Sequence, residues 1–482
     1  MTILKVLDLF AGCGGLSLGL ERAGLEPSVA VEKSPMAAET HFRNFHKRGF
    51  EWDQRVWEDL LESGKNGTFA KQLDHGTVVG DVWDLLEDQE SMDALFDLSP
   101  EVIVGGPPCQ GFSMAGRRNP EDERNQLPWA FLRFVERLAP KAVVIENVAG
   151  INMAFSSRGG VEPPFRQLHA ALEKTGIGYV VQPVELNARH FGVPQSRSRM
   201  MLIGMRSDLS GVNQLSVSDE PWRSQDAFEE ASAKRDPTLG LDLVPEIGSR
   251  VDRLRAGHHQ LIEYCVEDAL RDIDDFGYRD TTDYRKNGYR YARAMRGPRR
   301  SNAKLKNHVL RQHSEKVTER FDLYHFLHDE GIDTSILSIP GTCESEAKAR
   351  ELLSESLGDF SESTLPDNRL FIKENDRNLV DVVMRLHTRK HTQHVINGDE
   401  PAPTVVTLPD DYVHYRKNRI PTVRELARFQ SFPDWFEFRS KETTGSHRRR
   451  TEVPQYTQVG NAVPPLMAQA IGELLNKVLN RS

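Results

Sequence analysis

Close to its start the chain carries an apolar run that passes straight into a glycine-rich turn, Lys5-Val6-Leu7-Asp8-Leu9-Phe10-Ala11-Gly12-Cys13-Gly14-Gly15. The apolar residues predict a buried strand, and the pattern at Gly15–Ala23 predicts a helix directly after the turn. Glycines let the backbone approach a ligand closely, and the helix N-terminus favours negative charge there. The dinucleotide-binding fingerprint is incomplete, because Ser17 stands where its third glycine belongs. A tight structural turn without a ligand therefore stays open as the alternative.

The alternation of strand and helix continues to about residue 206. Further strands are predicted at Ser28–Glu32, Gly76–Val82, Glu101–Gly106, Lys141–Val148, Tyr179–Leu186 and Met200–Met205. Helices are predicted between several of them, as at Trp129–Leu138 and Pro164–Thr175. Strands that alternate with helices form a mostly parallel, doubly wound sheet. The predicted fold class is therefore α/β, with a Rossmann-like first domain.

The alternation of strands and helices is lost from about Ser207 to Asn397, where charge density rises and the hydrophobic pattern becomes irregular. We predict that residues 207–454 form a second, smaller and irregular domain, and that residues 1–206 and 455–482 together form the first. A helix is predicted at 422–430, with Thr422 as N-cap and Glu425 as its capping-box partner. The last helix, about Pro465–Leu479, is amphipathic and should pack back on the first domain.

Composition narrows the functional classes. The 482 residues include 62 Lys and Arg against 71 Asp and Glu, a net charge of −9, which argues against coating nucleic acid by bulk charge but permits a local basic patch. The four cysteines are far apart and form neither a disulfide framework nor a zinc signature. No stretch reaches the ~18 apolar residues of a membrane span. We expect a cytoplasmic protein without membrane association and without a bound metal.

Acidic residues stand at or near the ends of the first three predicted strands: Asp8, Glu32 and Asp81. The carboxyl ends of parallel strands meet at one edge of the sheet, where ligands of such folds bind. Glu32, about twenty residues past the glycine turn, is placed to accept hydrogen bonds from ribose hydroxyls. Solvated strand ends are the alternative, and the coincidence of three acids makes it the less attractive one.

A second loop at the same edge is more specific: Gly105-Gly106-Pro107-Pro108-Cys109-Gln110-Gly111-Phe112-Ser113. The two prolines stiffen the approach to Cys109, which occupies a loop where reactive residues gather. A lone cysteine is more often a small buried apolar residue. One strand later Glu146 reaches the same edge, and Gln195–Arg199 carries Arg197 and Arg199 in alternation. That pair suits an anionic partner, unless both arginines simply face water.

Taken in order, these motifs resemble those of the DNA cytosine-5 methyltransferase family. Asp8–Gly15 resembles the family's S-adenosylmethionine loop, Gly105–Ser113 its catalytic Pro-Cys-Gln loop, and Glu146-Asn147-Val148 and Gln195-x-Arg197-x-Arg199 follow in the family's order. Arg424–Pro433 resembles the helix that supports the target-recognition region. Gln458–Pro465 resembles the motif that completes the cofactor pocket. Six motifs in order do not arise by chance.

The resemblance implies an enzyme that flips a cytosine out of double-stranded DNA and methylates its carbon 5. It implies that Cys109 adds to carbon 6, that Glu146 engages the ring, and that Arg197 and Arg199 hold the base and its phosphate. The implied cofactor residues are Asp8, Phe10, Gly12, Gly14, Gly15, Glu32, Asp81, Pro108, Leu127 and Asn461. The implied DNA contacts include Ser113, Arg117, Arg118 and Gln195, most of them in a closing loop over Gln110–Leu127.

One departure from the family concerns adenine, since Lys33 follows Glu32 where many relatives carry an aromatic residue. Three other functions are compatible with parts of this pattern. A tRNA cytosine methyltransferase of the same fold is disfavoured because its Cys-Phe-Thr signature is absent. A catalytically silent DNA-binding relative is disfavoured by the presence of Pro108, Cys109 and Glu146. A nicotinamide oxidoreductase would need the missing glycine.

DNA binding is predicted at Arg285–Arg320, where twelve Lys and Arg stand against two Glu, a local charge of +10. Arg299 and Arg300 are the contacts expected there, and Tyr284, Tyr289 and Tyr291 could pack on sugars. The alternative is a solvated basic helix that balances the acidic stretch Glu263–Asp283. We expect a monomer on DNA, in the cytoplasm with the nucleoid, with a cognate restriction endonuclease or other defence components as possible partners. The recognised DNA sequence cannot be read from the pattern.

Overall fold

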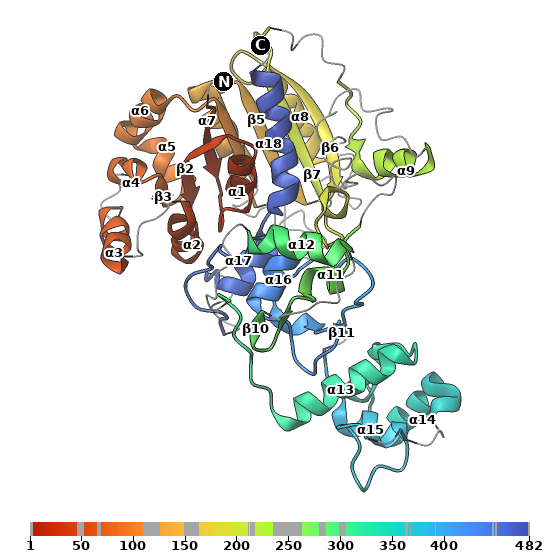
Figure 1. Ribbon diagram of the computed structural model, residues 1–482. Helices are drawn as coiled ribbons and strands as arrows, with labels where there is room; N and C mark the ends of the chain where they lie inside the picture. Colours follow the sequence, from red (N-terminus) through yellow and green to blue (C-terminus); the bar gives the residue numbers. More distant parts are fainter. Residues whose placement is uncertain are drawn as a thin grey trace.

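The computed structural model describes residues 3–45, 53–64, 69–108, 126–148, 163–210, 212, 217–234, 263–278, 286–297, 305–361, 365–366, 368–390, 392–445, 448 and 451–480. Its first part is built on an eight-stranded sheet in the order β3-β2-β1-β4-β5-β7-β6-β8 (Figure 1). The strands are β1 (Lys5–Leu9), β2 (Glu26–Glu32), β3 (Thr77–Val79), β4 (Val102–Gly105), β5 (Ala142–Val148), β6 (Tyr179–Asn187), β7 (Ser198–Arg206) and β8 (Trp222–Arg223). Only β7 runs antiparallel to its neighbours β5 and β6. The predicted mostly parallel α/β sheet is confirmed, with β8 as an unpredicted edge strand.

Helices cover both faces of this sheet. They are α1 (Gly15–Arg22), α2 (Pro35–Phe45), α3 (Gln54–Ser63), α4 (Ala70–Asp74), α5 (Val82–Glu87), α6 (Gln89–Leu98), α7 (Leu127–Leu138), α8 (Pro164–Lys174), α9 (Ser224–Lys234) and α18 (Pro465–Leu479). Alternate strand residues supply two separate cores, because successive side chains of a strand point to opposite faces. Val6 and Val104 belong to the core under α1 and α18, whereas Leu7 and Ile103 belong to the core under α7 and α8.

The last helix packs on the first (Figure 1). A Cβ atom added at Gly19 of α1 would lie 2.3 Å from Cβ of Ala468 and 2.5 Å from the carbonyl oxygen of Pro465, so only glycine allows this approach. Met467, Ile471 and Leu475 of α18 are fully buried in the core that this helix covers. The prediction that the C-terminal helix packs back on the first part of the chain is therefore confirmed.

Below the carboxyl edge of the sheet lies a junction of short elements. They are α11 (Val266–Leu270), β9 (Ile273–Asp274), β10 (Gly277–Tyr278), α12 (Lys286–Arg296), α16 (Val423–Phe429) and α17 (Gln455–Asn461). Their core includes Cys13 and Leu18 from the glycine turn and α1, so the junction is packed directly on the sheet part. The predicted capping box at Thr422 and Glu425 is confirmed.

A helical lobe extends from the junction, away from the sheet (Figure 1). It holds α13 (Glu315–Asp329), η5 (Thr334–Gly341), α14 (Glu346–Leu357), η6 (Gly358–Ser361) and α15 (Leu379–Leu386), with β11 (His394–Val395) and β12 (Tyr412–Val413) at its base. The lobe has a core of its own, centred on Phe321, Tyr324, Phe371 and Leu386. No helix in the described ranges is long and apolar enough to cross a membrane.

The junction buries an unusual amount of charge. The guanidinium of Arg428 is fully buried and forms ion pairs with the carboxylates of Asp272 and Asp434. Arg419 pairs with Asp275 at 2.8 Å and with Glu425 at 2.7 Å. Arg424 is also buried and donates to the carbonyl oxygen of Pro433 at 3.0 Å. Because buried charges are tolerated only when each has a partner, this network fixes how α16 meets its neighbours.

Candidate active site and cofactor pocket

A cavity of about 660 Å³ opens at the carboxyl edge of the sheet. This volume lies within the roughly 300–1,000 Å³ that is usual for small-molecule sites. The cavity brings together most of the predicted site residues: Asp8, Phe10, Gly12, Gly15, Glu32, Asp81, Pro108, Leu127, Glu146, Arg197, Arg199 and Asn461. They come from the ends of β1, β2, β4 and β5, from the start of α7, and from α17 near the other end of the chain.

The glycine turn owes its shape to left-handed backbone at Phe10 (φ 59°), Gly12 (φ 57°) and Gly14 (φ 93°). Gly14 is the N-cap of α1, and its amide donates to the carbonyl oxygen of Ala11 at 2.9 Å. Gly15 is required by crowding instead, because an added Cβ would lie 2.3 Å from the carbonyl oxygen of Val463. The turn is therefore shaped both by its own sequence and by the segment between α17 and α18.

Glu32 is held at the end of β2 by two backbone amides. The amide of Gly12 donates to its Oε2 at 2.9 Å and that of Ser34 to its Oε1 at 2.7 Å. Burial raises the pKa of Glu32, and the two amides act against that rise. Each carboxylate oxygen can accept more than one hydrogen bond, so the side chain keeps acceptor capacity toward the cavity that it lines.

Asp8 has a supporting position under the turn. Its Oδ2 accepts a hydrogen bond of 2.5 Å from the hydroxyl of Ser17, and the Ser17 oxygen lies 3.3 Å from Nε2 of His41. Burial raises the pKa of Asp8 to about 7 and lowers the pKa of His41 to about 3. Asp8 lines the cavity floor, but its hydrogen bond is made within the turn.

Lys33 forms an ion pair with Asp81, with Nζ 2.8 Å from Oδ2. Asp81 lies two residues beyond β3 and caps α5, where its Oδ1 accepts from the amide of Trp83 at 2.9 Å. Burial acts to raise the pKa of Asp81, but the Lys33 ammonium and the Trp83 amide hold it below its usual value. Trp83 also lines the cavity and is 37% exposed. Sequence reasoning missed Trp83, although a tryptophan two residues after the strand-end acid Asp81 was the available signal.

Glu146 and Arg199 form a largely buried ion pair at the other end of the cavity. Nε of Arg199 lies 2.8 Å from Oε1 of Glu146, and both side chains are close to nine-tenths buried. An added Cβ at Gly106 would lie 2.7 Å from Oε2 of Glu146, so a larger residue there would displace this carboxylate from its present position. The side chain of Asn147 donates to the carbonyl oxygen of Pro107 at 3.1 Å and ties the loop to β5.

The loop beyond Pro108 lies outside the described residues. Cys109, Ser113, Arg117 and Arg118 belong to that segment, and their predicted roles stay predictions. Pro108 itself is exposed at the cavity wall, directly before Cys109 in the chain.

The structure excludes one alternative for Gln195–Arg199, namely that both arginines simply face water. Only Arg199 belongs to β7, and neither arginine faces water, since Arg197 is 2% exposed and donates to the carbonyl oxygens of Val405 at 3.2 Å and Gly460 at 2.8 Å. Gln195 is fully buried: its Nε2 donates to the side chain of Gln430 at 3.0 Å and its oxygen accepts from the amide of Val405 at 2.8 Å. The expected contact between Gln195 and DNA stays a prediction, and in the structure the side-chain amide is bound by junction groups.

Much of the predicted basic segment is engaged inside the protein. Arg296 pairs with Asp272 at 2.7 Å, Arg311 pairs with Asp410 at 3.2 Å, and Arg320 donates to the carbonyl oxygen of Leu386 at 2.6 Å. Tyr291 is buried in the junction core and donates to the carbonyl oxygen of Arg428, so its expected packing on sugars is wrong. Arg299 and Arg300 lie outside the described residues. The predicted DNA-binding face therefore has fewer available cations than the sequence count suggests.

Comparison with known proteins agrees with this arrangement. A family profile described as "C-5 cytosine-specific DNA methylase" matches residues 4–477. The chain is 29% identical over 475 residues to Type II methyltransferase M.DdeI of Desulfomicrobium norvegicum, covering 98% of this chain and 88% of the relative. It is 28% identical to Type II methyltransferase M1.HphI of Haemophilus parahaemolyticus, covering 98% and 87%.

Among solved structures, the fold is similar to that of a protein described as a DNA modification methyltransferase encoded within an E. coli prophage. The TM-score is 0.51 at 23% identity, with 99% of both chains covered. Since the family profile spans nearly the whole sequence, the resemblance seen in the motifs is confirmed. The chain belongs to the C-5 cytosine-specific DNA methylase family, and it is a DNA cytosine-5 methyltransferase whose methyl donor is S-adenosyl-L-methionine.

Proposed function

We propose that this enzyme methylates a cytosine flipped out of a specific double-stranded DNA sequence, through a covalent adduct on Cys109. The observation that carries the proposal is the Glu146–Arg199 pair at 2.8 Å, which shares one cavity with Pro108. Cys109 follows Pro108 directly in the chain, so the proposed nucleophile is the sequence neighbour of a residue that lines the same cavity as the ion pair. A cytosine that is stacked inside the duplex cannot reach this cavity. It must therefore be flipped out, at a cost of a few kcal/mol.

The proposed chemistry of the chain begins with the Cys109 thiolate, which adds to carbon 6 of the cytosine and makes carbon 5 nucleophilic. Glu146, oriented by Arg199, engages ring nitrogen 3 and passes a proton to it, which offsets the negative charge that this addition pushes into the ring. S-adenosyl-L-methionine, when bound, supplies the methyl group to carbon 5. Loss of the carbon 5 proton and of Cys109 then restores the aromatic ring. Arg197 acts as a positioning residue, because its hydrogen bonds tie the segment before β7 to Gly460.

On the cofactor side we assign the ribose to Glu32. Its two oxygens are oriented by backbone amides and retain acceptor capacity toward the cavity, which fits a pair of vicinal hydroxyls. Gly12 allows the left-handed backbone of the turn and leaves open space beside it, whereas a Cβ at Gly15 would lie 2.3 Å from the carbonyl oxygen of Val463. Asn461 and Leu127 border the same cavity and complete the set.

For adenine we propose Trp83 as the stacking residue. Lys33 stands where relatives carry an aromatic, but its ammonium is held by Asp81, and Asp81 in turn caps the helix that carries Trp83. The three residues thus form one unit, in which the ion pair fixes the start of α5 and Trp83 offers an apolar ring at the cavity. Ring stacking contributes ~0.5–1.5 kcal/mol, so Trp83→Ala should weaken cofactor binding by roughly two- to twelvefold and Trp83→Phe by less. Titration calorimetry with S-adenosyl-L-methionine tests this, and equal affinity in Trp83→Ala contradicts it.

The covalent step is tested with DNA that carries 5-fluorocytosine at the target position. Fluorine replaces the proton that must leave carbon 5, so the wild-type enzyme should accumulate a denaturation-resistant adduct. Cys109→Ala should form no adduct and no product, whereas Cys343→Ala is the matched control and should behave as the wild type, because Cys343 lies in the helical lobe. An adduct on Cys109→Ala protein would overturn the assignment.

We further propose that the enzyme modifies the site of a restriction system. Support comes from its relatives, which are named Type II methyltransferases. A cognate endonuclease as functional partner, and a location with the DNA of the cell, follow from this proposal. Bisulfite sequencing of DNA from cells that express the chain would give the methylated context. Methylation scattered over unrelated contexts would contradict a sequence-specific role.

A further inference from the structure

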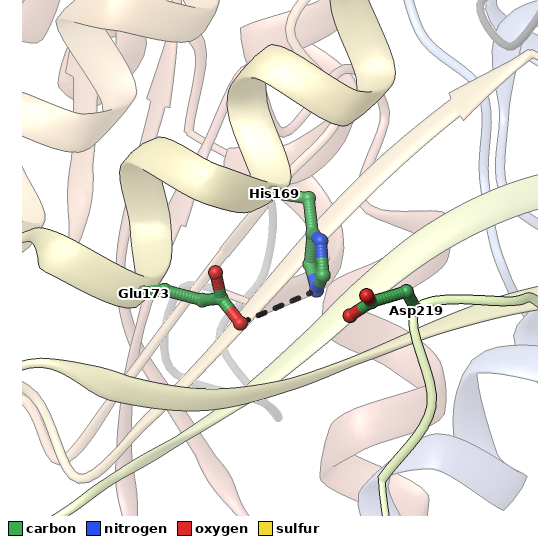
Figure 2. Close-up of side chains that lie close together, drawn as sticks. All are labelled: His169, Glu173 and Asp219. Atoms are coloured by element: carbon green, nitrogen blue, oxygen red, sulfur yellow. Dashed lines mark ion pairs between the residues drawn. The ribbon is translucent and has the colours of Figure 1, made fainter.

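A group of potential metal ligands lies outside the cofactor cavity, between α8 and the segment that leads into β8. His169 and Glu173 stand one turn apart on α8, and Asp219 lies on the segment that leads into β8. One ligand atom from each side chain lies within 4.8 Å of the other two (Figure 2). Sequence reasoning could not find this group, because Asp219 is separated from α8 by two strands and a loop.

His169 is the fixed member of the group. The residue is 9% exposed, and its Nε2 is buried without a hydrogen-bond partner among the described residues. Nε2 lies 3.9 Å from Oε1 of Glu173, too far for a hydrogen bond. Figure 2 shows the ring pointing its Nε2 between the carboxyl groups of Glu173 and Asp219. A buried ring nitrogen without a partner is costly, so something at this position is needed to satisfy it.

A small cavity adjoins the ring. It measures about 30 Å³, and His169, Asp219 and Glu220 are among its lining residues. A single water needs about 10–15 Å³ on such a measure, so the space admits one ion with a water ligand. Arg166, one turn before His169, forms an ion pair with Glu220 at 3.8 Å. It forms no ion pair with Glu173 or Asp219 among the described residues. The local charge beside the imidazole is therefore negative.

We propose that His169, Glu173 and Asp219 bind a divalent transition-metal ion of the Zn²⁺ class. One imidazole nitrogen with two carboxylates suits Zn²⁺ or its neighbours, whereas Mg²⁺ and Ca²⁺ prefer ligands that are all oxygen. In a tetrahedral zinc site with ~2.0–2.1 Å bonds, ligand atoms lie about 3.4 Å apart. The carboxylates must therefore move inward from the present spacing, and both are free to do so. Glu173 has 45% of its side chain exposed and Asp219 is exposed, while the buried imidazole stays in place.

The ion would fasten an edge that is otherwise loosely held. β8 pairs with β6 through only two residues, Trp222 and Arg223. The segment before it is bound through Gln182, which accepts from the amide of Ser218 at 3.0 Å, and through the exposed pair of Arg166 with Glu220. A metal shared by α8 and Asp219 would anchor the chain where it leaves the sheet for the variable region.

The test uses the full-length protein after dialysis against a chelator, with ZnCl2 as the probe. We expect one equivalent of Zn²⁺ to bind by calorimetry and to raise the unfolding temperature, and a chelator to reverse the rise. MgCl2 at the same concentration should not reproduce it. Asp219→Asn and Glu173→Gln keep side-chain size and should each lower Zn²⁺ affinity at least tenfold, the lower end of the loss seen even for groups that only support metal ligands.

The matched control is His328→Asn. His328 also lies beside a carboxylate, with Nδ1 3.5 Å from Oδ1 of Asp329. It is exposed, however, and does not belong to the group of three potential ligands. It should leave the one-equivalent binding unchanged. Binding of S-adenosyl-L-methionine by every variant verifies that the fold is intact. Absence of stoichiometric Zn²⁺ binding, or equal affinity in the wild type and the Glu173→Gln/Asp219→Asn double variant, overturns the proposal and leaves the group as an imidazole–carboxylate ion pair.

Discussion

The cavity edge and the α16 junction both bury charge, but they use it differently. At the junction each of the charged groups around Arg428 is matched inside the protein: its guanidinium meets Asp434 through two hydrogen bonds of 2.9 and 2.6 Å and also pairs with Asp272. At the cavity edge Glu32 receives two backbone amides and Glu146 one arginine, and both still face open space. The comparison teaches that satisfied charges fix geometry, whereas charges with spare capacity are available to a ligand.

The largest effect is expected at the junction. Arg428→Met should leave Asp434 buried without a cation and Asp272 with Arg296 alone, and should lower the free energy of unfolding by ~3–5 kcal/mol. Urea denaturation followed by circular dichroism measures this loss. Arg377→Ala is the control, because Arg377 pairs with Asp381 at 3.0 Å while 81% exposed, and it should cost at most about 1 kcal/mol. Similar losses of unfolding free energy in the two variants would contradict the claim that the buried charges of the junction fix its geometry.

The next effect is on the rate of methylation. Glu146→Gln keeps the size of the side chain and a hydrogen-bond acceptor for Arg199 but removes the charge, and should slow the single-turnover rate by ~10²–10³-fold. Because the pair is close to nine-tenths buried, the variant should also lose stability, so circular dichroism must show that it is folded under the assay conditions. Glu136→Gln, on an exposed pair of α7, is the matched control and should keep the full rate. A Glu146→Gln enzyme within threefold of the wild type would place the stabilising group elsewhere.

A smaller effect is expected on cofactor affinity. Glu32→Ala removes the acceptor oriented by Gly12 and Ser34, and should weaken binding of S-adenosyl-L-methionine by ~1–3 kcal/mol. Calorimetry gives the affinity directly, without DNA. Glu26→Ala, at the exposed start of the same strand, should bind as the wild type does. Unchanged affinity in Glu32→Ala would mean that the ribose is held by other groups.

The last effect is a dependence of stability on pH. Burial raises the pKa of Asp8 to about 7, from about 3.9 in an unfolded chain, so between these values the folded protein retains a proton that the unfolded chain has lost. The free energy of unfolding should therefore fall as pH rises through this window, by up to about 1.4 kcal/mol per pH unit from this group. Asp8→Asn should remove that contribution. Urea denaturation series at several pH values would contradict it if the wild-type and variant curves stay parallel.

The sheet and its edge could be predicted because their signals are local. Strand ends such as Glu32 and the glycine turn follow directly from hydrophobic runs and from the steric needs of a tight turn. The burial of Gln195 and Arg197 could not be predicted, because their partners Gln430 and Gly460 lie 235 and 263 residues away along the chain. The count of basic residues in Arg285–Arg320 misled for a related reason. A sequence shows the cations, but not the distant carboxylates, such as Asp410, that neutralise them.

The contact between Gly19 and the last helix has a consequence for the order of events during synthesis. One wall of the core beneath β1 and β4 is supplied by α18, so it is missing until nearly all 482 residues have been made. At about 5–20 residues per second, the ribosome needs some tens of seconds to pass from β7 to α18. Throughout that interval the apolar face that receives Met467 and Ile471 stays uncovered. The nascent sheet therefore exposes this apolar face during synthesis, and the cofactor pocket is completed only once Asn461 in its wall has been made.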